Sequence, residues 1–219
     1  MAVNHGRLKN KIGAFYQPRL VISDISTLRS LPTKEFIGGL AEVIKSAVIG
    51  DEELFAYLER NLDQIKSLDD RALETIVFRS AKIKAEVVEK DERDFGLRNI
   101  LNYGHTVGHA IESVSDFKVQ HGEAVAIGML AAARISNKLG LLDKNELIRL
   151  KGIIARAGLP TEFPNLQLES LIQAIRHDKK ILQGKVRFVL PKSIGNVFIT
   201  DEASLSLVER VLVNWNGET

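Results

Sequence analysis

Apolar positions recur at three- and four-residue intervals from residue 34 onward, the spacing that places side chains on one face of an α-helix. Residues 36–49 are mostly apolar, and the acidic run that begins at Asp51 predicts the start of a second, short helix. A long helix is expected over residues 69–93. Its apolar stripe predicts these buried side chains: Ala72, Ile76, Ser80, Ile83 and Val87.

The second half of the chain continues the helical pattern. Residues 122–139 are almost all Ala, Val, Ile, Met and Leu, which is typical of a helix buried on most of its sides. Further helices are predicted over residues 143–158, 166–177 and 204–214. Two β-branched runs, residues 186–190 and 196–200, predict a small hairpin. The predicted fold class is therefore mainly α, with one small β-hairpin.

The first thirty residues depart from this pattern. Residues 4–13 are polar, basic and interrupted by glycine, as expected of a loop, whereas residues 19–24 form a β-branched run that predicts one strand. A single strand leaves its backbone groups unpaired, so we expect it to belong to a sheet whose other strands lie outside this chain. The predicted domains are residues 1–33, a loop and one strand of that sheet, and residues 34–219, a helical domain.

Composition narrows the class of protein. The 219 residues are 45% hydrophobic and 26% charged, which is ordinary for a globular protein with one sizeable core. The net charge of +2 gives no electrostatic reason to expect a nucleic-acid partner. No apolar run reaches the roughly 18 residues of a membrane span, and no signal-peptide core is present, so we expect a cytoplasmic protein without a membrane partner. Without cysteine, the available metal ligands are His, Asp and Glu.

Candidate chemistry is concentrated in residues 99–123, which hold three of the five histidines. If residues 102–112 are helical, four polar side chains share one face: Asn102, His105, His109 and Glu112. The other side of that helix then presents apolar side chains to a core: Val107, Ala110 and Ile111. Such a polar face can bind a metal or an anion, although histidines one turn apart also occur on ordinary solvated faces.

A catalytic zinc usually takes three protein ligands and keeps one position open. The candidate ligands are Glu42, His105, His109, His121 and Glu123. Glu42 interrupts an apolar helix, where an unpaired carboxylate is costly to bury, but a surface pair with Lys45 would also explain it. His121 precedes a helix N-terminus, whose dipole favours the neutral imidazole that binds metal. Spacing alone pairs His105 with His109.

Basic residues in apolar or glycine-rich settings form a second group of candidates. They are Lys9, Lys45, Lys84, Arg98, Lys179 and Lys180. Each alone is explained as a solvated charge, but together with a metal they suit a small anionic substrate with carboxylate and phosphate groups. His177 and Asp178 resemble the His-Asp doublet of metal-dependent phosphohydrolases. That pattern also needs a distant downstream Asp, and the only one here, Asp201, directly follows the predicted hairpin.

Four longer motifs closely resemble the 3-dehydroquinate synthase family: residues 35–45, 84–93, 96–112 and 121–129. Residues 4–18 and 178–180 also fit, so the resemblance covers essentially the whole chain. It implies the helical C-terminal domain of the dehydroquinate synthase-like fold, and makes residues 1–33 a remnant of a Rossmann-like N-terminal domain. It also implies that NAD binds to the missing part of that domain, upstream of Met1. No NAD-binding residue is therefore expected in this chain, and the chain alone is expected to be inactive.

The resemblance also implies roles for individual residues. Zinc, or another divalent metal such as cobalt, would be held by Glu42, His105 and His121. The implied substrate and catalytic residues are Lys45, Lys84, Arg98, Asn102, His109, Lys179 and Asn10. His109, a ligand by spacing, becomes a substrate contact by resemblance. Of the two neighbouring lysines we choose Lys179 over Lys180.

The implied activity is that of a carbon–oxygen lyase that eliminates phosphate. It converts the anionic sugar phosphate 3-deoxy-arabino-heptulosonate 7-phosphate into 3-dehydroquinate, in the shikimate pathway to chorismate and the aromatic amino acids. The alternatives are a related sugar-phosphate cyclase, a polyol dehydrogenase of the same superfamily, or a non-catalytic metal-binding fragment. An apolar surface left by the missing domain predicts a homodimer.

Overall fold

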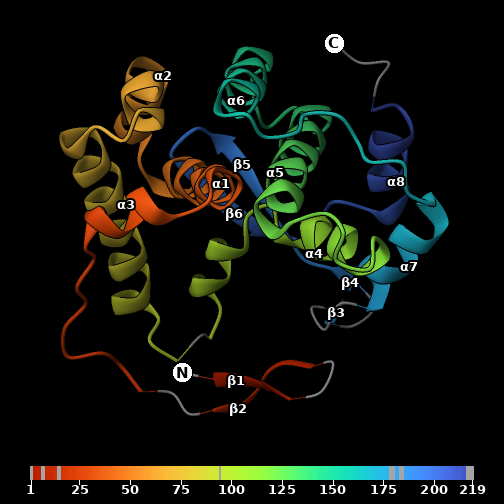
Figure 1. The fold of residues 1–219 in the computed structure, drawn as a ribbon. Helices are drawn as coiled ribbons and strands as arrows, with labels where there is room; N and C mark the ends of the chain where they lie inside the picture. Colours follow the sequence, from red (N-terminus) through yellow and green to blue (C-terminus); the bar gives the residue numbers. More distant parts are fainter. Residues whose placement is uncertain are drawn as a thin grey trace.

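The structure is a computed structural model that describes residues 2–5, 8–13, 16–93, 95–177, 181–182 and 185–215. Its α-helices are α1 (Thr33–Gly50), α2 (Glu52–Lys66), α3 (Asp70–Lys90), α4 (His105–Val114), α5 (His121–Lys138), α6 (Lys144–Ala157), α7 (Leu168–His177) and α8 (Leu205–Val213). Two 3-10 helices accompany them, η1 (Ile25–Ser30) and η2 (Leu97–Asn102). The prediction of a mainly α fold is confirmed (Figure 1). Among the described residues, no helix is long and apolar enough to cross a membrane.

Within the described ranges, the strands form three antiparallel pairs. They are β1 (Ala2–His5) with β2 (Leu8–Gly13), β3 (Ile181–Leu182) with β4 (Lys185–Val186), and β5 (Phe188–Ser193) with β6 (Asn196–Thr200). The pair β5–β6 confirms the predicted hairpin, and Phe188 opposite Thr200 sets its register. Its turn contains Gly195 at φ +84°, a left-handed conformation that glycine adopts without strain.

Helix α5 lies at the centre of the fold. It packs against α1, α4, α6, α8 and β5, and nearly every side chain from Gly122 to Ser136 is buried (Figure 1). Because its apolar residues occur on all sides, this helix has no solvated face of the usual width. The elements that carry the candidate site therefore all pack against one buried helix.

Glycines set how closely two helices approach α5. A Cβ on Gly122 would lie 2.5 Å from the Cα of Gly38 in α1, closer than any two unbonded carbons can approach. A Cβ on Gly128 would overlap the backbone of Gly104, just before α4. The small residues thus allow backbone-to-backbone contact at both crossings.

The N-terminal predictions are wrong in part. Residues 19–24 form no strand, and Leu20, Val21 and Ile22 are 75%, 69% and 81% exposed. The β-branched run finds no partner strand among the described residues, and a strand without a partner does not form. Residues 4–13 were expected to be a loop, yet β1 and β2 pair antiparallel, with Ala2 opposite Gly13 and Val3 opposite Ile12. The domain division at residue 33 stays a prediction.

The histidine segment also differs from the single helix that was predicted over residues 102–112. Asn102 ends η2, and α4 begins only at His105. Gly104 between them has φ +78°, and a Cβ there would lie 2.8 Å from Met129 Cγ. This left-handed residue breaks the helix, so Asn102 does not share a helix face with the histidines. The predicted buried side of α4 is confirmed for Val107, Ala110 and Ile111.

Candidate metal centre

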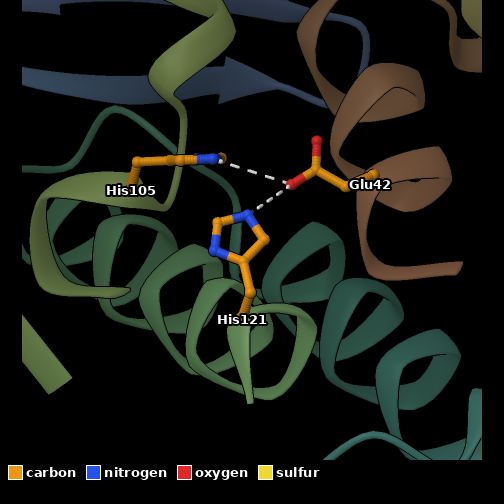
Figure 2. Close-up of side chains that lie close together, drawn as sticks. All are labelled: Glu42, His105 and His121. Carbon is orange, nitrogen blue, oxygen red and sulfur yellow. Dashed lines mark ion pairs between the residues drawn. The ribbon is translucent and has the colours of Figure 1, made fainter. Parts of the chain in front are cut away.

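Three side chains from three helices meet at one point (Figure 2). Glu42 comes from the middle of α1, His105 is the first residue of α4, and His121 is the first residue of α5. Glu42 Oε1 lies 3.6 Å from His105 Nε2 and 3.6 Å from His121 Nε2. One possible ligand atom from each residue lies within 4.8 Å of the other two, which is the spacing that one metal ion can bridge.

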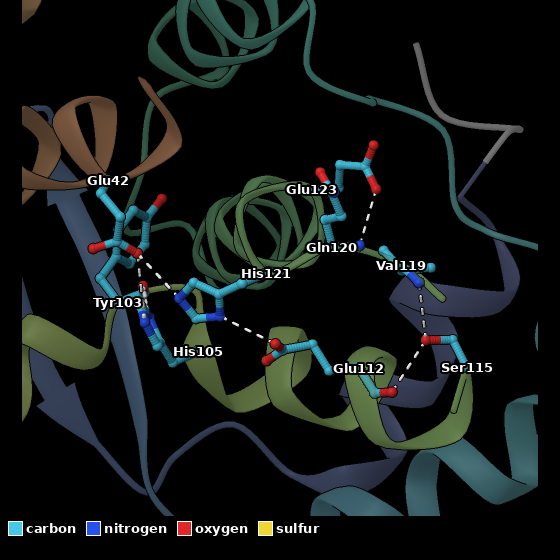
Figure 3. Close-up of polar contacts among 9 residues, drawn as sticks. All are labelled: Glu42, Tyr103, His105, Glu112, Ser115, Val119, Gln120, His121 and Glu123. Atoms are coloured by element: carbon cyan, nitrogen blue, oxygen red, sulfur yellow. Dashed lines mark hydrogen bonds and ion pairs between the residues drawn. The ribbon is translucent and has the colours of Figure 1, made fainter. Parts of the chain in front are cut away.

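Hydrogen bonds hold both imidazoles so that Nε2 faces Glu42 (Figure 3). His105 Nδ1 lies 3.0 Å from the backbone oxygen of Tyr103, and His121 Nδ1 lies 3.2 Å from Glu112 Oε1. A carbonyl and a carboxylate can only accept, so each Nδ1 carries the proton. When the ring is neutral, its Nε2 lone pair is then available to a metal.

Glu42 Oε1 is buried and has no hydrogen-bond partner within the part of the chain that the structure describes. Its other oxygen, Oε2, lies 2.6 Å from the ammonium of Lys45. An unsatisfied buried carboxylate oxygen is costly, and a cation between it and two imidazole lone pairs would remove that cost. Two imidazoles and one carboxylate are a ligand set that catalytic zinc uses, so the residues present fit the metal that the resemblance implied.

Burial and charge set the ionisation of the three side chains. Burial raises the pKa of Glu42, but the neighbouring His121 and the charge of Lys45 outweigh it and lower that pKa to about 2. Burial lowers the pKa of His105 to about 4, which keeps the ring neutral at pH 7. Glu112 and then Glu42 raise the pKa of His121 to about 9.

The carboxylates of Glu112 and Glu42 raise the pKa of His121 and favour its charged form, against the helix dipole, which favours the neutral form. The dipole effect is about 0.3–1 kcal/mol, and two adjacent carboxylates exceed it. A metal that binds here must displace a proton from His121. Metal binding should consequently release a proton at neutral pH.

The other predicted ligands lie differently. His109 is exposed, one turn after His105, with ring centroids 5.1 Å apart. Within the described ranges, two groups could hold a metal, Glu42–His105–His121 and His109–Glu112–His121, and neither contains the pair His105 and His109 that spacing favoured. Glu123 belongs to neither group. It accepts the backbone N–H of Gln120 at 3.0 Å and points away from the centre (Figure 3).

The structure describes the side chains of some predicted substrate residues and not of others. Lys45 is buried beside Glu42. Lys84 is exposed on α3, Arg98 is half-buried in η2, and Asn102 ends η2, which packs against α1 and α3. Both α3 and η2 pack against α1, which carries Glu42, and the roles of these three residues stay predictions. Lys179, Lys180 and the side chain of Asn10 lie outside the described residues.

Two residues that sequence reasoning did not assign a role help to build the centre. Tyr103 is fully buried, donates its hydroxyl proton to Met129 at 3.1 Å, and presents its own carbonyl to His105. Glu112 is buried and forms a hydrogen bond with His121. Helical spacing placed Glu112 on the same face as His105, but its contact with His121 did not follow from spacing.

Comparison with known sequences identifies the family. The profile for "3-dehydroquinate synthase C-terminal" matches residues 39–181, and the profile for "3-dehydroquinate synthase N-terminal" matches residues 1–38. The 3-dehydroquinate synthase of Dehalococcoides mccartyi strain 195 is 53% identical over 201 residues, which are 92% of this chain and 56% of that protein. The 3-dehydroquinate synthase of Rippkaea orientalis is 49% identical over 97% of this chain and 59% of its own length. The chain thus spans less than two thirds of these relatives.

Solved structures show the same fold. The 2-epi-5-epi-valiolone synthase of Streptomyces hygroscopicus, with NAD+ and Zn2+ bound, matches 95% of this chain and 59% of its own at a TM-score of 0.86 and 25% identity. A 2-deoxy-scyllo-inosose synthase in complex with carbaglucose-6-phosphate, NAD+ and Co2+ matches 96% of this chain and 60% of its own at a TM-score of 0.84 and 26% identity. With profiles that together match residues 1–181, the chain belongs to the 3-dehydroquinate synthase family.

Proposed function

We propose that this chain supplies the metal- and substrate-binding part of a 3-dehydroquinate synthase. The observation that carries the proposal is the buried Oε1 of Glu42, which lies between the Nε2 atoms of His105 and His121 and has no hydrogen-bond partner among the described residues. Relatives named 3-dehydroquinate synthase are about half identical, whereas the cyclases of known structure are 25–26% identical. This difference favours the synthase over the related cyclases.

We assign the metal to Glu42, His105 and His121, with zinc as the first choice and cobalt as a substitute, in line with the ions held by the two similar cyclases. Bound there, the cation would polarise a hydroxyl or carbonyl oxygen of the substrate as a Lewis acid. Lys45 keeps Glu42 ionised and holds its Oε2, so that Oε1 stays turned to the imidazoles. NAD, which both cyclases also hold, is assigned to the N-terminal domain of the family, which this chain matches only over residues 1–38.

The substrate is a small anionic sugar phosphate, 3-deoxy-arabino-heptulosonate 7-phosphate, and the products are 3-dehydroquinate and phosphate. Lys84, Arg98 and Asn102 are assigned to its carboxylate and hydroxyl end, where charge-assisted hydrogen bonds orient it. His109 is exposed beside the metal ligands, so its imidazole can donate a hydrogen bond or a proton to the phosphate. Asn10 and Lys179 are assigned to the same phosphate from the family resemblance alone.

This assignment makes the intact protein a phosphate-eliminating carbon–oxygen lyase of the shikimate pathway, in the cytoplasm. A homodimer of the 219-residue chain stays part of the proposal, because this chain exposes the apolar side chains of Leu20, Val21 and Ile22.

Metal analysis of three histidine variants tests the proposal. We expect His105→Ala and His121→Ala to lose zinc, because each removes one of three ligands. His109→Ala should keep nearly one zinc per chain. In a full-length enzyme the same His109→Ala change should abolish phosphate release while zinc remains bound. Loss of zinc in His109→Ala together with retention in His121→Ala would overturn the assignment.

A further inference from the structure

His121 belongs to both groups of potential metal ligands, and this creates a choice. The first group is Glu42–His105–His121, and the second is His109–Glu112–His121. His121 Nε2 faces Glu42, whereas its Nδ1 faces Glu112 (Figure 3). A neutral imidazole has one lone pair and one N–H, so it can bind a metal on only one of these sides.

Glu112 is built to hold His121 rather than to bind a metal itself. Its side chain is only 6% exposed, and it lies in the last turn of α4, two turns after His105 on the same face. Its Oε1 lies 3.2 Å from His121 Nδ1. A buried carboxylate on a packed helix has few alternative rotamers, so it offers a fixed acceptor.

The imidazole of His121 needs such a fixed partner more than that of His105 does. His105 has a side chain only 10% exposed, and the backbone carbonyl of Tyr103 holds its Nδ1. The side chain of His121 is 44% exposed, so packing alone leaves its ring free to turn. The hydrogen bond to Glu112 therefore replaces the packing that fixes the other imidazole.

We infer that Glu112 is a positioning residue that selects the Nδ1–H tautomer of His121, directs Nε2 to the metal, and thereby limits the chain to one metal ion. This inference rests on the proposed metal centre. A carboxylate that accepts the outer N–H of a ligand histidine also makes the ring a stronger donor to the metal. Glu112, a member of the second group of potential ligands, consequently orients His121 for the metal that the first group would bind.

The test uses the 219-residue chain and Zn2+ or Co2+ alone. Competition titration with a chelator gives the zinc affinity of the unchanged chain, of Glu112→Gln and of Glu112→Ala. The Co2+ absorption spectrum and long-range proton–nitrogen NMR of the five histidines report the ligand field and the tautomer of His121. Glu123→Gln is the matched control, because it removes a carboxylate two residues from His121 that points away from the centre.

Zinc affinity should fall about tenfold in Glu112→Gln, whose amide is a weaker acceptor of similar shape, and by up to about a hundredfold in Glu112→Ala. The zinc-bound unchanged chain should show one metal and a proton on His121 Nδ1. Glu112→Ala should show a mixture of tautomers and an altered Co2+ spectrum, whereas Glu123→Gln should match the unchanged chain. A purely structural role for Glu112 would leave the tautomer and the spectrum unaltered.

Equal zinc affinity and an unaltered tautomer in Glu112→Gln would overturn this inference while the metal centre stands, and so would two bound metals per unchanged chain. If Glu112→Ala fails to fold, Glu112→Gln decides, because it keeps the buried volume. Failure of the unchanged chain to bind zinc would instead refute the proposed centre itself.

Discussion

The change Gly122→Ala should disturb the metal centre without touching a ligand. Gly122 follows His121 in α5 and meets Gly38 of α1, one turn before Glu42. The glycine pair therefore sets the distance between the two helices that carry Glu42 and His121. Adding one methyl group at this crossing changes that distance directly.

The size of the effect follows from the contact. The new Cβ would lie 2.5 Å from the Cα of Gly38, whereas unbonded carbons settle at about 3.5–4.0 Å, so the helices must separate by about 1 Å. Overpacking of this kind costs about 1–3 kcal/mol of unfolding free energy. Ligand positions tolerate only about 0.2 Å, so zinc affinity should fall by about tenfold or more as Glu42 moves away from His121.

Urea unfolding with and without zinc measures both effects. The control is Gly39→Ala, one residue away in α1, where a Cβ would meet nothing within 4 Å. Removing glycine from that helix interior should stabilise the protein by about 0.5–1 kcal/mol and leave zinc affinity unchanged. Unfolding of Gly122→Ala at the same urea concentration as the unchanged chain, together with equal zinc affinity, would contradict this expectation.

Three further outcomes are expected. Burial raises the pKa of Asp51, but hydrogen bonds from Arg79 and from the N–H of Leu54 hold it below its ordinary value. The resulting stabilisation is complete above the unfolded pKa of about 3.9 and is lost as pH falls through the lower folded value. Asp51→Asn should therefore lower the free energy of unfolding by about 1–3 kcal/mol at pH 7 and by little at pH 2, as measured by urea unfolding. Hydrogen exchange should find residues 19–24 among the least protected amides of the monomer, and strong protection there would contradict the exposed segment seen here. The chain alone should bind zinc, but it should show no NAD binding by calorimetry and negligible phosphate release. Phosphate release at about 1–1000 per second would contradict the assignment of NAD to the N-terminal domain.

The helical part of the fold was predictable because its signals are local. The acid at Asp69 caps α3, and Ser204 caps α8, each by accepting a backbone N–H of the first turn. The hairpin of β5 and β6 was also predictable, because its two strands are neighbours along the chain. Residues 19–24 carry an equally good strand pattern and stay unpaired, since strand formation depends on a partner that local pattern cannot supply.

The break in the helix at Gly104 could not be predicted either, because it too depends on a contact between distant parts of the chain. Gly104 has a left-handed backbone and lies so close to α5 that a Cβ would meet Met129 at 2.8 Å, and this closeness is a tertiary contact. Without that contact, an uninterrupted helix from Asn102 is the simplest interpretation of the pattern.

The metal ligands could be predicted only in part. Spacing along one helix selects His105 and His109, because local geometry is all that spacing contains. Glu42 and His121 join His105 through the crossings of α1 and α4 with α5, and only the family resemblance indicated that set. The supporting role of Glu112 needed coordinates, since it depends on which nitrogen of His121 faces the carboxylate.

The three proposed ligands come from three helices, and Glu42 lies more than sixty residues before His105 along the chain. A metal ion can therefore meet all three only after α1, α4 and α5 have packed together. The cation would bind to a core that has already folded, and the helices would not need the cation in order to pack together. A tenfold drop in free zinc would then lower the stability of the chain by up to about 1.4 kcal/mol while its shape stayed the same. The lifetime of this protein in a cell would consequently follow the supply of metal.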